Sequence, residues 1–174
     1  IGYEAAKAFA ERGKNLIVAA RRTENLEALK CEITEQHPTL DVIIRTVDLS
    51  VLRNVYQFYS SLKDFQLETW VNNAGFGNYD SVAQQDLGKI DTMLRLNVEA
   101  LTILSSLFVR DYKDVPGTQL INLSSCGGYT IVPTAVTYCA TKFYVSTFTE
   151  GLAWELIESG AKMRAKVLAP AATQ

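Results

Sequence analysis

The pair of residues in this sequence best suited to proton transfer is Tyr138 and Lys142, four positions apart. On a helix these positions lie on the same face, so the ammonium group can lie beside the phenol. A phenol with a pKa of about 10 is a poor acid or base near neutrality, but a neighbouring positive charge lowers that pKa. The pair could then exchange a proton with a carbonyl or alcohol oxygen. Ser125, thirteen residues earlier, could donate a hydrogen bond to the same oxygen.

The spacing Tyr-x-x-x-Lys occurs three times, and only the third copy lies in a context that suggests catalysis. The copies Tyr3–Lys7 and Tyr59–Lys63 have no serine thirteen positions earlier, since position 46 is a threonine and the sequence starts at residue 1. Such pairs are usually half-exposed residues on an amphipathic helix. The third copy follows a strand-like run, residues 120–125, that ends in two serines. This context makes Ser125, Tyr138 and Lys142 the candidate catalytic set.

Short apolar runs alternate with longer segments of helical period along the chain. The pattern predicts helices over residues 3–12, 24–36, 51–63, 86–112 and 134–158, and strands over residues 16–20, 42–47, 69–71, 120–123 and 165–169. This alternation predicts one domain, residues 1–174, with a doubly wound parallel sheet in a three-layer α/β/α arrangement. Such sheets bind ligands beyond the carboxyl ends of their strands. Polar residues follow the predicted strands at this edge, among them Arg21, Asp48, Asn73 and Ser125.

The composition excludes several classes of protein. With 48% apolar and 21% charged residues and a net charge of −2, the chain gives no electrostatic reason to bind nucleic acid or an anionic membrane. No uninterrupted apolar run approaches the roughly 20 residues of a membrane span. The three cysteines are widely spaced and odd in number, which favours a reducing, cytoplasmic location. The single histidine, His37, has no partner for a metal site, and we predict none.

Four motifs resemble those of the short-chain dehydrogenase/reductase family, and they span essentially the whole chain in the family's order. The motifs are Asn72–Gly75, the asparagine of Leu96-Asn97-Val98, Asn122–Ser125 and Tyr138–Lys142. The resemblance implies a Rossmann-type fold and an oxidoreductase that interconverts a carbonyl and an alcohol with a nicotinamide cofactor. In this chain the first strand of the family's fold and its C-terminal part are expected to be absent.

The resemblance also implies roles for the motif residues. Tyr138 would be the catalytic acid or base, and Ser125 would orient the substrate oxygen. Lys142 would lower the pKa of Tyr138 and hold the nicotinamide ribose, and Asn97 would support a water that relays protons to Lys142. Ordinary structural explanations remain open, because Asn97 could cap a local helix irregularity and Asn72–Gly75 is also a common strand-to-turn sequence.

The cofactor-binding residues implied by the resemblance come from several parts of the chain. They are Gly2, Arg21, Arg22, Asp48, Leu49, Asn73, Ala74, Gly75, Tyr138, Lys142 and Pro170. Only Ile1-Gly2 of the family's glycine-rich turn is present, so we expect most of the pyrophosphate site to be missing from this chain. Asp48 matches the family's adenine contact, and it could equally cap the helix that follows it.

The choice between the two nicotinamide cofactors can be predicted from residues after the first strand. NAD enzymes usually place a carboxylate roughly 20 residues beyond the glycines, on the ribose 2′-hydroxyl. This sequence has Arg21 and Arg22 there, two guanidinium groups suited to a 2′-phosphate. The alternative is that Arg21 and Arg22 are only basic residues at the start of a helix. The helix dipole disfavours this alternative, because it favours anions at the N-terminal end. The sequence therefore favours NADP over NAD.

We expect an NADP(H)-dependent oxidoreductase acting on a small, apolar substrate, and the alternative is a non-catalytic nucleotide-sensing or scaffold protein on the same fold. Phe76, Tyr79, Tyr129 and Val132 could line an apolar pocket or could be packing residues. The helices predicted over 86–112 and 134–158 resemble the family's assembly surfaces, which implies a homodimer or homotetramer. Because the chain begins with isoleucine, we also expect a longer protein, with an intact mass above 19.3 kDa.

Overall fold

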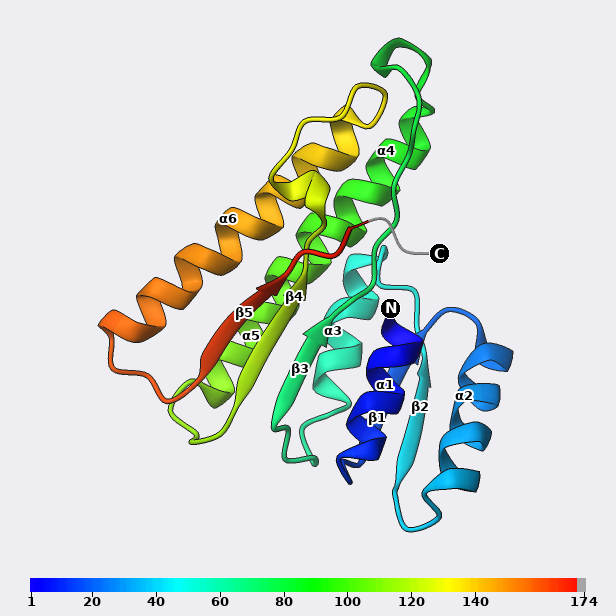
Figure 1. Cartoon of the computed structure of the whole chain (residues 1–174), viewed down its shortest axis with the longest axis vertical. Helices are drawn as coiled ribbons and strands as arrows, with labels where there is room; N and C mark the ends of the chain where they lie inside the picture. Colours follow the sequence, from blue (N-terminus) through cyan, green and yellow to red (C-terminus); the bar gives the residue numbers. More distant parts are fainter. Residues whose placement is uncertain (172–174) are drawn as a thin grey trace. The chain divides into compact units, whose positions relative to one another are not determined.

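The computed structural model describes residues 1–171 of the chain, and its elements follow the predicted alternation of helices and strands (Figure 1). By their contacts the residues divide into two compact units, Ile1–Asp48 and the chain from Leu49 onward. All described strands pair in parallel within their own unit.

The first unit packs two helices on a two-stranded sheet. It comprises α1 (Gly2–Glu11), β1 (Leu16–Ala20), α2 (Thr23–Gln36) and β2 (Val42–Thr46). Its core consists of small and branched side chains from both helices and from β2: Ala6, Ala10, Leu29, Ile33 and Val42. Gly13, with φ of +72°, turns the chain after α1 in a left-handed conformation that favours glycine.

The second unit contains a three-stranded sheet of order β3-β4-β5 with helices packed against it. Its helices are α3 (Leu52–Ser60), α4 (Leu87–Leu94), α5 (Leu101–Tyr112) and α6 (Val136–Glu158), and its strands are β3 (Thr69–Asn72), β4 (Gln119–Leu123) and β5 (Arg164–Leu168). Short helical turns, η1 (Val82–Gln84) and η3 (Cys126–Gly128), lie in the loops after β3 and β4.

A fully buried polar network fixes how this sheet meets its helices. Asn72 Nδ2 on β3 donates to Asn122 Oδ1 on β4 at 2.8 Å and to Ser105 Oγ on α5 at 2.9 Å. Asn122 Nδ2 donates in turn to Thr149 Oγ1 on α6 at 3.0 Å. Since the Asn122 side chain meets both helices, α5 and α6 pack on the same face of the sheet. Buried amides without such partners would be costly, so the network favours one register.

The main difference from the predicted elements lies in the segment 86–112, which was expected to be one regular helix. A π-helical turn, η2 (Arg95–Ala100), separates α4 from α5. Such turns are rare and are found frequently at functional sites. Asn97 lies within it and is 1% exposed, so a polar side chain occupies the middle of the apolar stripe. The other boundaries agree with the predicted ones to within three residues.

By length and composition, one helix among residues 1–171 could cross a membrane. It is the continuous stretch Leu87–Tyr112, 26 residues long, with a mean hydropathy of 1.3 over its most apolar window. A core helix passes the same test, and this stretch packs on β3, β4 and α6. One such helix is weak evidence for a membrane location.

The parallel strands of the second unit end at a common edge, and this edge carries the candidate catalytic residues. Backbone hydrogen bonds continue beyond the strand ends, from Ser124 N to Leu168 O at 2.8 Å and from Cys126 N to Pro170 O at 2.9 Å. The loop after β4 is therefore held against the end of β5. Ser125 lies in this held loop, and Tyr138 and Lys142 lie in the first two turns of α6.

Candidate active site

Tyr138 and Lys142 share one face of α6, as their spacing predicts. The Lys142 Nζ atom lies 5.8 Å from the centroid of the Tyr138 ring. Lys142 is 7% exposed, and its Nζ donates a hydrogen bond of 2.9 Å to the carbonyl of Leu123 at the end of β4. One ammonium proton is thus used to anchor the side chain to the sheet, and the other two remain for further acceptors.

Burial governs the proton affinity of Lys142. An ammonium group loses hydration when it is enclosed, which disfavours the charged form. This burial lowers the pKa of Lys142 to about 8. Lys142 is therefore still mostly charged at neutral pH and loses its proton in mildly alkaline solution.

The pKa of Tyr138 is raised, not lowered, in this structure. The largest cause is burial of the phenol, while a hydrogen bond with Ser125 acts in the opposite direction and the nearby Tyr79 raises the pKa further. The Tyr138 pKa was expected to be lowered, and it is raised because burial outweighs the hydrogen bond with Ser125. A lowering contribution from Lys142 stays a prediction. At neutral pH the phenol is in its acid form.

Ser125 is held beside the phenol by the turn that follows β4. Its Oγ accepts a hydrogen bond of 3.2 Å from the backbone N–H of Gly127. Gly127 lies close to the Tyr138 ring, since a Cβ placed there would be 3.7 Å from Cε1 of Tyr138 and 3.3 Å from Cys139 Sγ. The structure therefore brings together the predicted catalytic serine, tyrosine and lysine.

Asn97 anchors the loop that follows β3. Its Oδ1 accepts from Phe76 N at 3.1 Å, and its Nδ2 donates to Phe76 O at 2.9 Å and to Thr141 Oγ1 at 3.1 Å. Thr141 Oγ1 donates onward to the carbonyl of Tyr138 at 2.7 Å. Asn97 is thus linked to Tyr138 through Thr141, and the proton relay to Lys142 stays a prediction.

Sequence reasoning did not single out Thr141 or the requirement for Gly75. A Cβ on Gly75 would lie 2.9 Å from Asn97 Oδ1, so the close approach of this loop to the π-helical turn needs glycine. The sequence feature that could have identified Thr141 is its position three residues after Tyr138. From this position on a helix, a threonine hydroxyl can donate a hydrogen bond to a carbonyl of the preceding turn.

The predicted cofactor residues of the second unit lie in or near the loops at this edge. Asn73, Ala74 and Gly75 are exposed directly after β3, and Pro170 follows β5 with its carbonyl bonded to Cys126 N. Leu49 is partly buried at the start of the unit, before α3.

The predicted cofactor residues of the first unit follow its two strands. Arg21 and Arg22 are exposed after β1, and Asp48 is partly buried after β2. A hydrogen bond of 2.8 Å between Thr23 Oγ1 and Thr46 Oγ1 joins the two loops of this edge. Gly2 is the first residue of α1. Helix α3 has Val51 as its N-cap residue, with no side-chain cap hydrogen bond, so Asp48 is not the N-cap residue itself.

Arg21 and Arg22 fit a phosphate monoester. Both guanidinium groups are exposed at the start of α2, and neither forms an ion pair within residues 1–171. Planar guanidinium groups bind phosphate oxygens through paired hydrogen bonds. The donor set therefore suits the 2′-phosphate of NADP.

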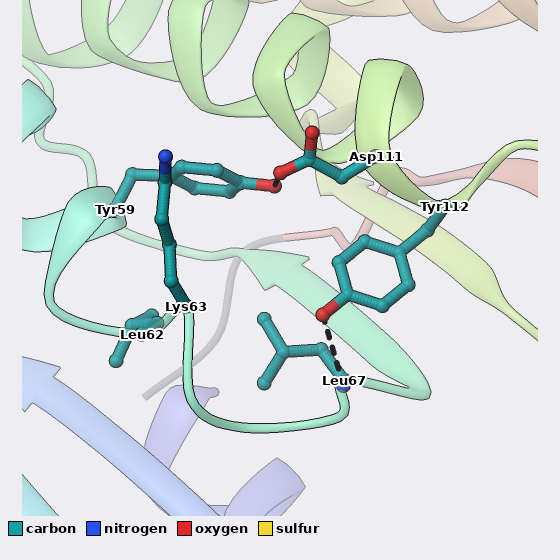
Figure 2. Close-up of a pocket in the computed structure, with 6 residues that line it drawn as sticks. All are labelled: Tyr59, Leu62, Lys63, Leu67, Asp111 and Tyr112. Carbon is teal, nitrogen blue, oxygen red and sulfur yellow. Dashed lines mark hydrogen bonds between the residues drawn. The ribbon is translucent and has the colours of Figure 1, made fainter.

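The second copy of the tyrosine–lysine spacing lies in a different environment, shown in Figure 2. Tyr59 donates a hydrogen bond of 2.8 Å to Asp111 Oδ2, and burial with this carboxylate strongly raises the pKa of Tyr59. Lys63 lies beyond the end of α3, so the two residues do not share a regular helix face. They line a pocket of about 430 Å³ next to the segment that leads into β3, at the amino end of that strand, with Leu62, Leu67 and Tyr112.

The first copy, Tyr3–Lys7, belongs to a surface cluster. Lys7 Nζ forms an ion pair of 2.6 Å with Glu32, and the Tyr3 hydroxyl donates to the same carboxylate. In each of the first two copies the phenol therefore donates its proton to a carboxylate, Glu32 for Tyr3 and Asp111 for Tyr59. The third copy is the one that the structure supports.

A family model described as short chain dehydrogenase matches residues 1–174. Among curated proteins, the human Dehydrogenase/reductase SDR family member 11 is 29% identical over 98% of this chain and 68% of its own length. The 7beta-hydroxysteroid dehydrogenase of Clostridium sardiniense is 29% identical over 89% of this chain and 59% of its own.

Solved structures agree with these matches. The short-chain dehydrogenase from Sphingobium yanoikuyae in complex with NADPH superposes with a TM-score of 0.90 at 27% identity, over 98% of this chain and 66% of that one. The bulky-bulky ketone specific alcohol dehydrogenase from Comamonas testosteroni gives 0.85 at 26% identity, over 98% and 68%. The predicted Rossmann-type parallel α/β fold is confirmed. The chain spans about two thirds of the length of these proteins.

Proposed function

Because the chain belongs to the short-chain dehydrogenase family, as its motifs predicted, we propose that the protein is an NADP(H)-dependent oxidoreductase that interconverts a carbonyl and an alcohol on a small, apolar substrate. The observation that carries this proposal is the grouping of Ser125, Tyr138 and Lys142 at the carboxyl edge of the β3-β4-β5 sheet. Ligands of parallel α/β folds bind at this edge.

Tyr138 exchanges the proton in the proposed reaction. Its raised pKa keeps the phenol protonated at neutral pH, so it can donate the proton to a carbonyl oxygen during reduction. In oxidation the phenolate form would take up the proton of the alcohol. The Ser125 hydroxyl lies beside the phenol and can donate a hydrogen bond to the same oxygen as charge develops there. A bound nicotinamide supplies or accepts the hydride.

Lys142 and the two arginines are the proposed contacts to NADP. The ammonium protons of Lys142 that do not bond Leu123 can bind ribose hydroxyls, and Arg21 and Arg22 can bind the 2′-phosphate. The Sphingobium yanoikuyae relative, 27% identical, is in complex with NADPH, which supports the choice of NADP over NAD. The remaining proposed contacts are Gly2, Asp48, Leu49, Asn73, Ala74, Gly75, Tyr138 and Pro170.

Exposed apolar side chains on the loops after β3 and β4 support an apolar substrate. Tyr79 is 67% exposed on the first loop, and Ile131 is 77% exposed on the second. Both loops lead to the Tyr138 ring, so substrate would approach along apolar surfaces. Phe76, Tyr129 and Val132 remain candidates for the same lining.

The decisive experiment is the Tyr138→Phe substitution, assayed with NADPH absorbance on a panel of uncharged ketones and aldehydes. We expect a loss of activity of about a thousandfold, within the range of general acid catalysis, with an unchanged melting temperature. Near-normal turnover in the variant would exclude the mechanism. Binding of NADPH by the unaltered protein without turnover of any panel member would instead favour the nucleotide-sensing or scaffold alternative.

We also propose that the protein is a cytoplasmic homodimer or homotetramer. Free thiols at Cys31, Cys126 and Cys139 suit a reducing compartment. Helix α6 exposes large apolar side chains, with Trp154 68% and Ile157 57% exposed, and a second copy could cover them. Light scattering that gives a monomer mass would exclude the assembly, and cell fractionation tests the location.

A further inference from the structure

The ring of Tyr138 is packed against a second tyrosine, Tyr79, from the loop after β3. We propose that Tyr79 is a positioning residue for Tyr138: with Gly77 it fixes the Tyr138 ring and thereby the place of the phenol oxygen beside Ser125. The inference rests on the proposed function, in which Tyr138 transfers the proton. The two rings are tilted by 46°, and their centroids are 5.9 Å apart. This distance is typical of attractive aromatic pairs.

Gly77 is seated between the two rings. A Cβ at this position would lie 3.2 Å from Cδ2 of Tyr138 and 3.2 Å from Cε2 of Tyr79. Both distances are shorter than ordinary carbon contacts, so a side chain at position 77 would require the two rings to shift by a few tenths of an ångström. Gly77 does not have a positive φ, so its requirement here comes from this contact and not from backbone conformation.

The opposite edge of the Tyr138 ring meets the loop after β4. A Cβ on Gly127 would be 3.7 Å from Cε1 of Tyr138, on the other side of the ring from Cδ2. The loop that contains Gly77 and the loop that contains Gly127 therefore lie at opposite sides of the Tyr138 ring. Tyr79 adds an aromatic contact from the first loop.

The first loop is itself held in place. Asn97 bonds both the N–H and the C=O of Phe76, the residue directly before Gly77. A chain of contacts thus runs from the π-helical turn through Phe76 and Gly77 to Tyr79 and the phenol. Because the Tyr79 side chain is 67% exposed, replacing it removes this contact without opening the core.

The titratable groups that face the Tyr138 phenol come from three places. Lys142 and Cys139 are on α6, Cys126 is in the turn after β4, and Tyr79 is in the loop after β3. Proximity of Tyr79 raises the pKa of Tyr138. Loss of the Tyr79 ring should therefore move the pKa of Tyr138 down.

The test compares Tyr79→Ala with Tyr79→Phe in the full protein. We expect the alanine variant to lose about tenfold in kcat with the KM for NADPH unchanged. The phenylalanine variant keeps the ring and should stay within about threefold of the original kcat. An alanine variant with unaltered kcat, or one in which only the KM for the carbonyl substrate changes, would overturn the proposal.

A second readout does not need turnover. Tyrosine labelled with ¹³C at Cζ reports the titration of each phenol by NMR, and Tyr138→Phe identifies the signal of Tyr138. In Tyr79→Ala this titration should shift to lower pH, whereas an unmoved titration rejects the positioning role. If the unaltered protein turns over no carbonyl while the shift is seen, the proposed function fails and the packing inference stands.

Gly77→Ala should also lower kcat, because the added methyl group displaces the rings. Gly151→Ala is the matched control, since a Cβ at Gly151 on α6 meets no atom within 4 Å. The control should retain full activity, and equal activity in the two variants would contradict the role of Gly77. The melting temperatures of Gly77→Ala and Gly151→Ala show whether a lower kcat comes from displaced rings or from a less stable fold.

Discussion

At the scale of single residues, Lys142 combines a proposed functional role with a cost in stability. Burial lowers its pKa from 10.5 to about 8, a difference of about 2.5 units or roughly 3 kcal/mol, at 1.36 kcal/mol per unit. The folded protein binds the proton less tightly than the unfolded chain does. The cost is therefore fully present below pH 8 and is relieved as pH rises from about 8 to 10.5.

The Lys142→Met substitution should reveal this cost. At pH 7 we expect the variant to be more stable by about 1–3 kcal/mol, because the buried charge is removed while one hydrogen bond to Leu123 is lost. The difference should shrink towards pH 9.5. Urea unfolding followed by the fluorescence of Trp70 and Trp154, both in the second unit, measures it.

The exposed Lys113 offers the control for this measurement. Lys113→Met makes the same chemical change at an exposed position. The difference in stability between this variant and the original protein should not depend on pH. A stability difference between Lys142→Met and the original protein that stays constant from pH 7 to 9.5 would contradict the role of burial.

The same residues show what the sequence could predict at this scale. The spacing placed Tyr138 and Lys142 on one helix face, and the strand-like run before Ser125 placed the serine near them. Their proton affinities could not be predicted, because burial depends on Gly77, Gly127 and other residues distant in sequence. The phenol pKa was expected to fall, and it rises because burial outweighs the hydrogen bond from Ser125.

At the scale of elements, the π-helical turn η2 is the feature that sequence patterns did not reveal. Leu94, Val98 and Leu101 continue an apolar stripe through it, so the periodicity indicated one regular helix over 86–112. The signal that remained was Asn97, a polar residue within that stripe. The structure explains it, because Asn97 turns its amide to the Phe76 backbone.

This anchoring can be distinguished from a proton relay by the Asn97→Leu substitution. The variant leaves the N–H and C=O of Phe76 without their partner, so we expect a loss of about 3 kcal/mol in stability and exchange of the Phe76 amide hydrogen at least tenfold faster. Hydrogen exchange followed by NMR measures it. Thr102→Val, which removes a hydroxyl from the next helix α5, is the control. If Asn97→Leu loses turnover while the Phe76 amide hydrogen exchanges at its original rate, Asn97 acts through a solvent proton relay and not by anchoring the loop.

At the scale of the whole molecule, alternation of helices and strands was enough to predict parallel strands with helices packed on them. The strand ends then placed four polar candidates at the carboxyl edges of their own sheets: Arg21, Asp48, Asn73 and Ser125. The described residues form two compact units, each with its own sheet, and this division was not visible in the sequence pattern. Arg21 and Arg22, the proposed contacts to the 2′-phosphate, belong to the first unit.

The Arg21→Asp substitution tests the proposed preference for NADP. The original protein should use NADPH better than NADH, and the variant should lose about a hundredfold in the ratio of the two kcat/KM values. Such a change equals roughly 3 kcal/mol, the size expected when a charge-assisted hydrogen bond to phosphate is replaced by repulsion. The control is Arg12→Asp, which makes the same charge change directly after α1, away from the loops that follow β1 and β2. This variant should leave the ratio of the two kcat/KM values unaltered. A preference for NADH in the original protein, or an equal ratio in Arg21→Asp, would exclude Arg21 as the residue that selects NADP.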